Sequence, residues 1–255
     1  KWNVSLSQMH VVKLQSKQIG IVPIYNLEEG LKKRVQELGI QILYGEFQQF
    51  QDDKTKAVNI LHDGKEETLP YDILVAADGA HSRVREALHV QCNIFGEVNG
   101  FSAFIPHAQS ETTVGISYPI KTNGFFLRKI GFSTGSIIFA QRILDPHAKE
   151  AISEKEFQEL LKSCHLNKEC QSLVDGKADV LYNITITLQQ VEQFSDEEKG
   201  AIIVGDAAAT ASFFKGMGAN TALKTASLAG EFFSKIQQHD RDSYASFNLK
   251  IKEAT

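Results

Sequence analysis

The chain has 255 residues, of which 42% are hydrophobic and 23% are charged, and its formal net charge is −4. These are ordinary values for a globular protein, and this length allows one large domain or two small ones. Because no stretch concentrates Lys and Arg with aromatic residues, the sequence gives no support for nucleic-acid binding.

Membrane and metal sites are also unsupported by the sequence. No apolar run is long enough to cross a bilayer, and the first residues lack the charged and apolar regions of a secretion signal. The three cysteines, Cys92, Cys164 and Cys170, show no C-x-x-C spacing, which argues against a disulfide framework or a zinc site. We therefore expect a cytoplasmic protein with no transmembrane segment and no metal.

The first third of the chain predicts strands around one amphipathic helix. Apolar residues recur at helical spacing from Leu27 to Leu38, Asn26 is a suitable N-cap and Gly39 a suitable stop. Asp63-Gly64 has the composition of a hairpin turn. The strands expected in this part of the chain cover residues 4–12, 19–25, 40–44, 57–61 and 71–75.

Between residues 96 and 193 the sequence predicts short strands with few helices. Residues 121–124 read Lys-Thr-Asn-Gly, a hairpin turn, and Ser153 with Glu156 forms the capping-box pattern that begins a single helix. An antiparallel sheet inserted into a nucleotide-binding fold usually covers a ligand cleft. The strands expected here cover residues 100–105, 112–118, 125–131, 136–143 and 178–188.

Two acidic turns, each placed where an apolar strand stops, are the most informative feature. The first is Asp78-Gly79, followed by Ser82 and Val84-Arg85. The second is Gly205-Asp206, after the expected strand 201–204, and it runs into a helix expected over residues 218–236; a last helix is expected from residue 240. Such turns present backbone N–H groups and a fixed carboxylate to a nucleotide, and two of them in this order indicate a flavin site.

Both turns resemble fingerprints of the FAD-dependent aromatic-ring monooxygenases, the para-hydroxybenzoate hydroxylase-like flavoproteins. This resemblance implies an α/β fold: a flavin-binding Rossmann-like domain (residues 1–95 and 196–255) with an inserted α+β, mixed or antiparallel sheet domain for substrate (residues 96–195). It also implies FAD as cofactor and an NADH- or NADPH-dependent monooxygenase that hydroxylates a small, aromatic substrate with oxygen. The cofactor-binding residues that it implies are Asp78, Gly79, Arg85, Gly205, Asp206, Ala207, Gly216, Met217, Gly218, Ala219 and Asn220.

Physical reasoning gives some of these residues a role. A carboxylate at Asp206 can accept hydrogen bonds from the ribityl hydroxyls, and the helix N-terminus behind Gly216 and Gly218 offers positive partial charge to the pyrimidine edge of the ring. Phe213 and Phe214 are candidates for the substrate pocket, although packing of the loop explains them equally well. The sequence identifies no catalytic residue, and His81 in the first turn is more simply a surface histidine.

Departures from the family pattern leave other functions open. The chain has no G-x-G-x-x-G loop for the ADP pyrophosphate, so we expect an upstream segment or a partner chain to complete FAD binding. Ala209, Phe213 and Thr225 replace the histidine, proline and acid that are usual in the family, and Ile24 replaces an arginine. The alternatives are an FAD-binding dehydrogenase, reductase or halogenase, and a non-catalytic remnant.

Overall fold

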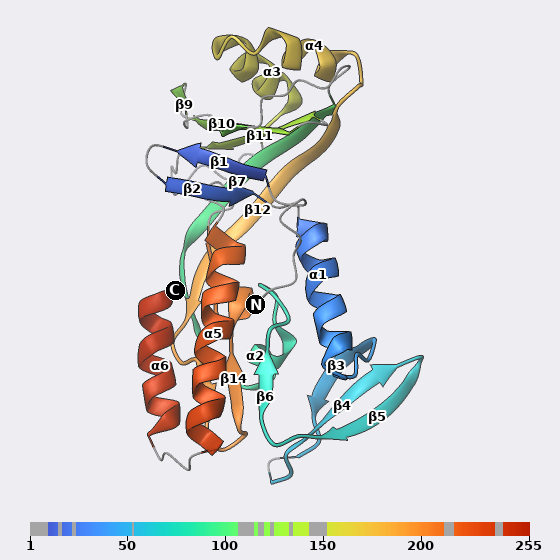
Figure 1. Cartoon of the computed structure of the whole chain (residues 1–255), viewed down its shortest axis with the longest axis vertical. Helices are drawn as coiled ribbons and strands as arrows, with labels where there is room; N and C mark the ends of the chain where they lie inside the picture. Colours follow the sequence, from blue (N-terminus) through green and yellow to red (C-terminus); the bar gives the residue numbers. More distant parts are fainter. Residues whose placement is uncertain are drawn as a thin grey trace. The chain divides into compact units, whose positions relative to one another are not determined.

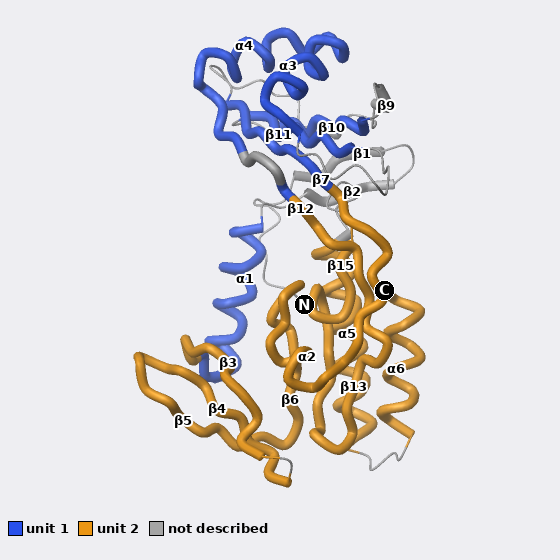
Figure 2. Tube along the Cα trace, turned by 180° about the vertical axis from the view of Figure 1, so that it is seen from behind, with its two compact units in different colours: residues 1–42, 99–184 blue, residues 43–98, 185–255 orange. Residues whose placement is uncertain are grey.

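A computed structural model describes residues 10–14, 17–21, 24–52, 54–106, 115–116, 120–122, 125–132, 135–142, 152–211, 217–237 and 242–255. The chain forms two compact units: unit 1 comprises residues 1–42 and 99–184, and unit 2 comprises residues 43–98 and 185–255 (Figure 2). Two of the three boundaries fall within long strands, β7 (Cys92–Pro106) and β12 (Asp179–Val191), and the third lies between residues 42 and 43. The assignment of residues 96–195 to a substrate domain stays a prediction.

Unit 1 is built on an antiparallel sheet whose strands differ in length. The strand order of the whole seven-stranded sheet is β15-β12-β7-β11-β10-β8, with β9 also paired to β10. Of these strands, β15 belongs to unit 2 and is described below. The strands between residues 115 and 142 are β8 (Gly115–Ile116), β9 (Ile120–Thr122), β10 (Phe125–Phe132) and β11 (Gly135–Arg142).

One face of this sheet is covered by two helices, α3 (Glu154–Ser163) and α4 (Asn167–Val174) (Figure 1). Alternate residues of the strands, such as Phe101, Leu127 and Ile138, are fully buried with Phe157 of α3. The rings of Phe101 and Phe157 lie 3.9 Å apart between centroids. Each buried side chain of this size contributes about 1.5–3 kcal/mol to folding, so these contacts hold the helices on the sheet.

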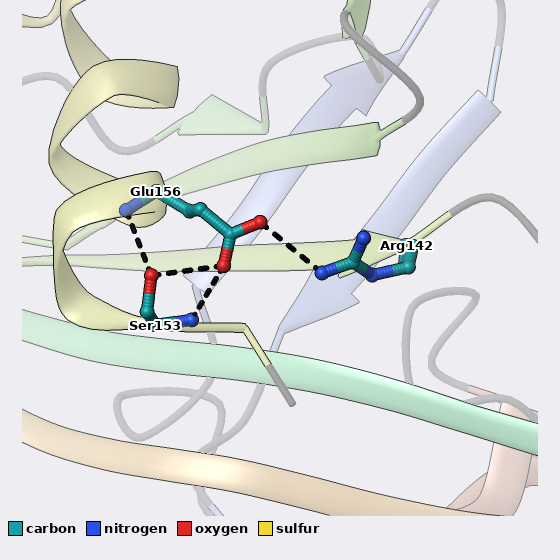
Figure 3. Close-up of polar contacts among 3 residues, drawn as sticks. All are labelled: Arg142, Ser153 and Glu156. Carbon is teal, nitrogen blue, oxygen red and sulfur yellow. Dashed lines mark hydrogen bonds and ion pairs between the residues drawn. The ribbon is translucent and has the colours of Figure 1, made fainter. Parts of the chain in front are cut away.

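Helix α3 begins with a capping box, as the sequence predicts. The Ser153 hydroxyl accepts from the Glu156 N–H at 3.2 Å, and the Glu156 carboxylate accepts from the Ser153 N–H at 2.9 Å (Figure 3). The same carboxylate accepts from Arg142 Nη2 of β11 at 3.2 Å. The backbone and side-chain hydrogen bonds of Ser153 are the main reason that the pKa of Glu156 is lowered. The cap thus also ties α3 to the sheet.

The N-terminal part of unit 1 comprises a hairpin and a helix. Strands β1 (His10–Leu14) and β2 (Lys17–Ile21) pair antiparallel, and α1 (Ile24–Glu37) has no buried residue. Throughout the described ranges we find no helix with the length and hydropathy needed to cross a membrane.

Unit 2 contains two three-stranded sheets and a helical layer. Strands β3 (Gly45–Phe50), β4 (Ala57–His62) and β5 (Lys65–Pro70) form an antiparallel meander. The second sheet has the order β13-β14-β6, in which β6 (Leu74–Ala76) and β14 (Ala201–Ile203) are parallel and β13 (Ser195–Asp196) is antiparallel. The other elements are α2 (Arg83–Ala87), the 3₁₀ turn η2 (Gly205–Ala207), β15 (Ala209–Thr210), α5 (Met217–Gln237) and α6 (Ser243–Ala254).

The core of unit 2 lies between the second sheet and α5 and α6, which run side by side (Figure 1). Ile202 and Ile203 of β14 are completely buried, and Phe232 of α5 packs against Phe247 of α6 with 5.3 Å between ring centroids. The continuous apolar run in β14 is typical of a parallel strand that is buried on both faces. This core fixes the end of β14, where the second acidic turn begins.

Several predicted elements are confirmed and others are wrong. The strands expected near residues 57–61, 125–131, 136–143 and 201–204 and the helix over 218–236 are present. Residues 40–44 form no strand, because pairing with β4 begins only at Gly45, and their apolar side chains are exposed. The predicted strand 71–75 is shorter, as β6, and follows an unpredicted β5 whose residues are mostly exposed.

The helices also differ at their ends. Helix α1 begins at Ile24, so Asn26 is inside the first turn and is not the N-cap, and the last helix begins at Ser243. Helices α2 and α4 are not predicted from the sequence. Both are short, at 5 and 8 residues, and local periodicity is weak over such lengths.

The capping box of α3 can be tested by exchange. Ser153→Ala removes the acceptor of the Glu156 N–H and should cost about 1 kcal/mol of local stability. Amide hydrogen exchange in α3 should therefore become about fivefold faster. Glu159→Ala, an exposed change on the same helix, should leave exchange nearly unchanged; equal rates in both variants would show that the cap contributes nothing.

Candidate flavin site

The first acidic turn links β6 to α2 and holds the start of that helix. Asp78 Oδ2 accepts from the Val84 N–H at 3.2 Å, and the buried Ser82 hydroxyl accepts from the Arg85 N–H at 3.0 Å. Gly79 has a φ of +88°, a left-handed conformation that favours glycine. Thus Asp78 is partly engaged as a helix cap, and its carboxylate remains exposed at the surface of the turn.

The second acidic turn begins beside the first, because β6 and β14 are parallel. Ile203 pairs with Ala76, and the Val204 N–H donates to the Ala76 carbonyl at 2.9 Å. The carboxyl ends of parallel strands meet at one edge of a sheet, where α/β proteins bind ligands. The two turns, far apart in the sequence, therefore lie at the same edge.

Gly205 is held tightly against α5. It has a φ of +60°, and a Cβ at this position would lie 3.7 Å from Ala222 Cβ of α5. Its N–H donates to Thr225 Oγ1 at 2.9 Å, and this hydroxyl donates in turn to the Ala222 carbonyl at 3.0 Å. Thr225 is fully buried. Thr225, which replaces the acidic residue usual in the family, therefore connects the backbone of the turn to α5.

The carboxylate of Asp206 is available to a ligand. It lies at the surface of the turn, and no described residue forms a hydrogen bond or ion pair with it. The protein packed around it removes part of its hydration, and this desolvation raises the pKa of Asp206. A Cβ at Gly218, in the first turn of α5, would lie 3.8 Å from Asp206 Oδ1. The carboxylate thus faces the N-terminal end of α5.

Arg85 joins the two turns. Its Nη1 donates to the Ala207 carbonyl at 2.8 Å, and its Nη2 donates to the Ala80 carbonyl at 2.9 Å. Gln189 Nε2 of β12 donates to the same Ala80 carbonyl at 2.9 Å. One side chain of α2 therefore fixes the distance between the backbone of the first turn and that of the second.

The short strand β15 holds the far side of the second turn. Its residues Ala209 and Thr210 pair with Gln190 and Gln189 of β12. The Thr210 hydroxyl accepts from the Gln189 N–H at 3.1 Å and donates to the Thr187 carbonyl. Ala209, which replaces the usual histidine, is buried in this pairing.

The structure brings most of the predicted site residues to one edge of unit 2. Met217, Gly218, Ala219 and Asn220 form the first turn of α5, and Gly218 approaches Asp206. Phe213, Phe214 and Gly216 lie outside the described residues. His81 is exposed in the first turn. Sequence reasoning missed Thr225 as an acceptor and Gln189 altogether, because their partners are set by the fold.

These residues fit a flavin cofactor. Ribityl hydroxyls are donors, and the Asp206 carboxylate is an acceptor without a partner among the described side chains. The adjoining N-terminal end of α5 carries the positive end of the helix dipole, which suits an electron-rich ring edge.

Comparison with known proteins supports the same class of site. The family model described as an FAD binding domain matches residues 3–243. The chain therefore belongs to this FAD-binding family, which confirms the family indicated by the two turns. A comparison with curated proteins gave no match.

Solved structures confirm the fold. A triple mutant of the flavin-dependent brominase Bmp2 is 14% identical with a TM-score of 0.73, and the match covers 91% of this chain and 62% of that one. CabE, an aromatic hydroxylase from angucycline biosynthesis, is 14% identical with a TM-score of 0.68, covering 94% and 49%. OxyS anhydrotetracycline hydroxylase from Streptomyces rimosus is 16% identical with a TM-score of 0.66, covering 94% and 48%. The chain thus spans about half to three fifths of the length of these proteins.

The Thr225 contact gives a direct stability prediction. Thr225→Val keeps the shape of the side chain but leaves the Gly205 N–H without its acceptor, which should cost about 1–3 kcal/mol. Thr225→Ser keeps the hydroxyl and should retain most of the stability. Thermal unfolding of both variants provides the measurement, and equal melting temperatures would show that the hydrogen bond is unimportant.

The raised pKa of Asp206 predicts a pH dependence. The folded chain binds the proton of the Asp206 carboxyl more tightly than the unfolded chain does. The stabilisation by this proton is therefore fully present at acid pH. It is lost as the pH rises through the folded pKa, above the ordinary aspartate value. Relative to wild type, Asp206→Asn should therefore gain stability as the pH rises through this window in urea unfolding without FAD. A pH-independent difference would contradict the desolvated carboxylate.

Proposed function

We propose that the chain is the FAD-binding portion of an NADH- or NADPH-dependent monooxygenase that acts on a small organic, aromatic substrate. The observation that carries this proposal is the Asp206 carboxylate, which is exposed, partly desolvated and without a partner among the described residues. It lies where two parallel strands end and α5 begins. An accessible carboxylate whose pKa is shifted by its surroundings is a candidate for ligand binding.

Each part of the site has a role toward FAD. Asp206 would accept from the ribityl hydroxyls, and the first turn of α5, from Met217 to Asn220, would provide N–H groups to the ring. Asp78 and Gly79 would border the pyrophosphate. The backbone of Gly205 and Ala207 would approach the cofactor closely. When bound, the flavin supplies the redox and oxygen chemistry, while the protein orients the cofactor and excludes water. Phe213, Phe214 and Gly216 remain candidates for the pocket and the ring contact.

A flavin-dependent halogenase is the second candidate. The brominase Bmp2 structures have TM-scores of 0.73 and 0.72 to this chain, above the 0.68 of the hydroxylase CabE. Both candidates share the FAD site described here and differ in the oxygen acceptor, a small aromatic substrate or a halide ion. Product analysis with reduced flavin, oxygen and bromide distinguishes them, because only the halogenase gives a brominated product.

Full FAD binding is proposed to need a further segment, upstream of Lys1 or on a partner chain. Neither acidic turn contains the G-x-G-x-x-G loop that cradles a pyrophosphate. Within the described strands, β6 pairs only with β14, so its second edge can accept another parallel strand. Such a strand would end beside Asp78 and would bring its glycine loop to the pyrophosphate side.

Asp206→Asn tests the FAD site itself. Replacing the carboxylate with an amide removes charge-assisted hydrogen bonds to the ribityl hydroxyls and should weaken FAD binding by about 1–3 kcal/mol. Flavin fluorescence titration measures the affinity. Glu253→Gln on α6 changes the charge equally at an exposed position and should bind FAD as wild type does. Because a further segment is proposed to complete the FAD site, we expect weak binding by the wild-type chain. Unchanged affinity in Asp206→Asn, or no binding by the wild-type chain even at high FAD concentration, would contradict the proposal.

A further inference from the structure

We infer that Arg85 is a positioning residue: its guanidinium locks the Asp78 turn and the Asp206 turn into one rigid cofactor-binding unit. This inference rests on the proposed FAD site. The resemblance to the monooxygenases implies that the arginine lies toward the nicotinamide region. In this chain, two of its N–H groups are directed instead at backbone carbonyls of the two turns.

The geometry of the contact explains why an arginine suits position 85. The guanidinium is a planar fork whose donors keep a fixed separation, so it sets the distance between the Ala80 and Ala207 carbonyls. A lysine has one ammonium and cannot hold two separate backbone acceptors in the same fixed geometry. Ala207 is completely buried, so its carbonyl would lose a charged donor with little access to replacement water.

Arg85 is itself held in place by local structure. Its backbone N–H donates to the buried Ser82 hydroxyl, which fixes the first turn of α2. Gln189 donates to the same Ala80 carbonyl as Arg85 does, so that β12 supports the first turn from a second direction. The first turn of α2 therefore holds Arg85 in place, and Arg85 connects the first acidic turn to the second.

The charge of Arg85 adds a second effect. No ion pair with a described Asp or Glu involves this guanidinium, whereas Arg83 on the same helix pairs with Glu46 at 2.7 Å. An arginine whose charge is not neutralised by a neighbouring carboxylate raises the positive potential around it. This potential favours an anionic cofactor between the two turns. The hydrogen bonds of Arg85 and its positive charge would therefore both favour FAD binding.

The consequence for the site follows from the sequence of the second turn. Ala207 directly follows Asp206, so the hydrogen bond to the Ala207 carbonyl fixes the Ala207–Ala208 peptide, one residue beyond the carboxylate proposed to bind flavin. Without the guanidinium, this peptide keeps the hydrogen bond from the Ala208 N–H to the Gly205 carbonyl at 3.0 Å but loses the contact on its carbonyl side. The second turn, and with it the carboxylate, is then held less firmly. Loss of Arg85 should therefore weaken FAD binding even though Arg85 need not contact FAD.

The experiment compares Arg85→Met and Arg85→Lys with the matched control Arg83→Met, two residues away on the exposed side of α2. Hydrogen exchange of the protein without FAD should become faster at residues 78–82 and 205–211 in Arg85→Met, with little change in α6. FAD affinity should fall by about tenfold or more in Arg85→Met, as expected for a lost charged hydrogen bond. Arg85→Lys should be intermediate, and Arg83→Met should match wild type.

Chemical rescue separates positioning from a general loss of stability. Millimolar guanidinium should restore part of the FAD affinity of Arg85→Ala and slow exchange at residues 205–211, an effect that a merely misfolded variant would not show. Unchanged exchange at residues 205–211 in the Arg85 variants, or wild-type FAD affinity in Arg85→Met, overturns the inference. If Arg85→Met does not fold, the same two readouts on Arg85→Lys decide. Failure of the wild-type chain to bind FAD even at high FAD concentration would count against the proposed function. Hydrogen exchange without FAD tests the Arg85 contact alone.

Discussion

The parallel pairing of β6 with β14 brings the two acidic turns of the candidate site together. Three residue pairs, from Leu74 with Ala201 to Ala76 with Ile203, place the ends of the two strands side by side. Because both strands end at one edge, Asp78 and Asp206 follow at that edge, and α2 and α5 start beside it. The pairing depends in turn on the buried core of β14 against α5 and α6. Hydrophobic burial in unit 2 is thus what brings two distant acidic turns together.

Polar contacts then give the turns their rigidity. The second turn is bound to α5 through Thr225, to α2 through Arg85, to β12 through β15, and to β6 through the Val204 N–H. Each contact satisfies a backbone group that would be costly to leave unpaired. Asp206, in contrast, has no partner in the described part of the chain and has a raised pKa. A rigid frame around one solvent-accessible carboxylate is what a preorganised ligand site requires.

The features predicted from the sequence are those encoded locally. The apolar run before Asp206, the acidic turns and the capping box at Ser153 depend on neighbours within a few residues, so their patterns can be recognised. Residues 40–44 show the limit, because their apolar alternation predicts a strand but no described strand pairs with them. The role of Thr225 and the contact from Arg85 to Ala207, 122 residues away, could not be predicted, since folding alone brings these partners together.

We propose that the two acidic turns and the start of α5 together form one FAD site. The most direct test is a ¹H–¹⁵N correlation titration of the deuterated chain with FAD. We expect the largest shift changes at residues 78–85, 205–211 and 217–220, and we expect them to saturate at one common affinity. Helices α3 and α4 of unit 1 serve as the unaffected reference. Shift changes confined to other regions, or different affinities for the two turns, would contradict it.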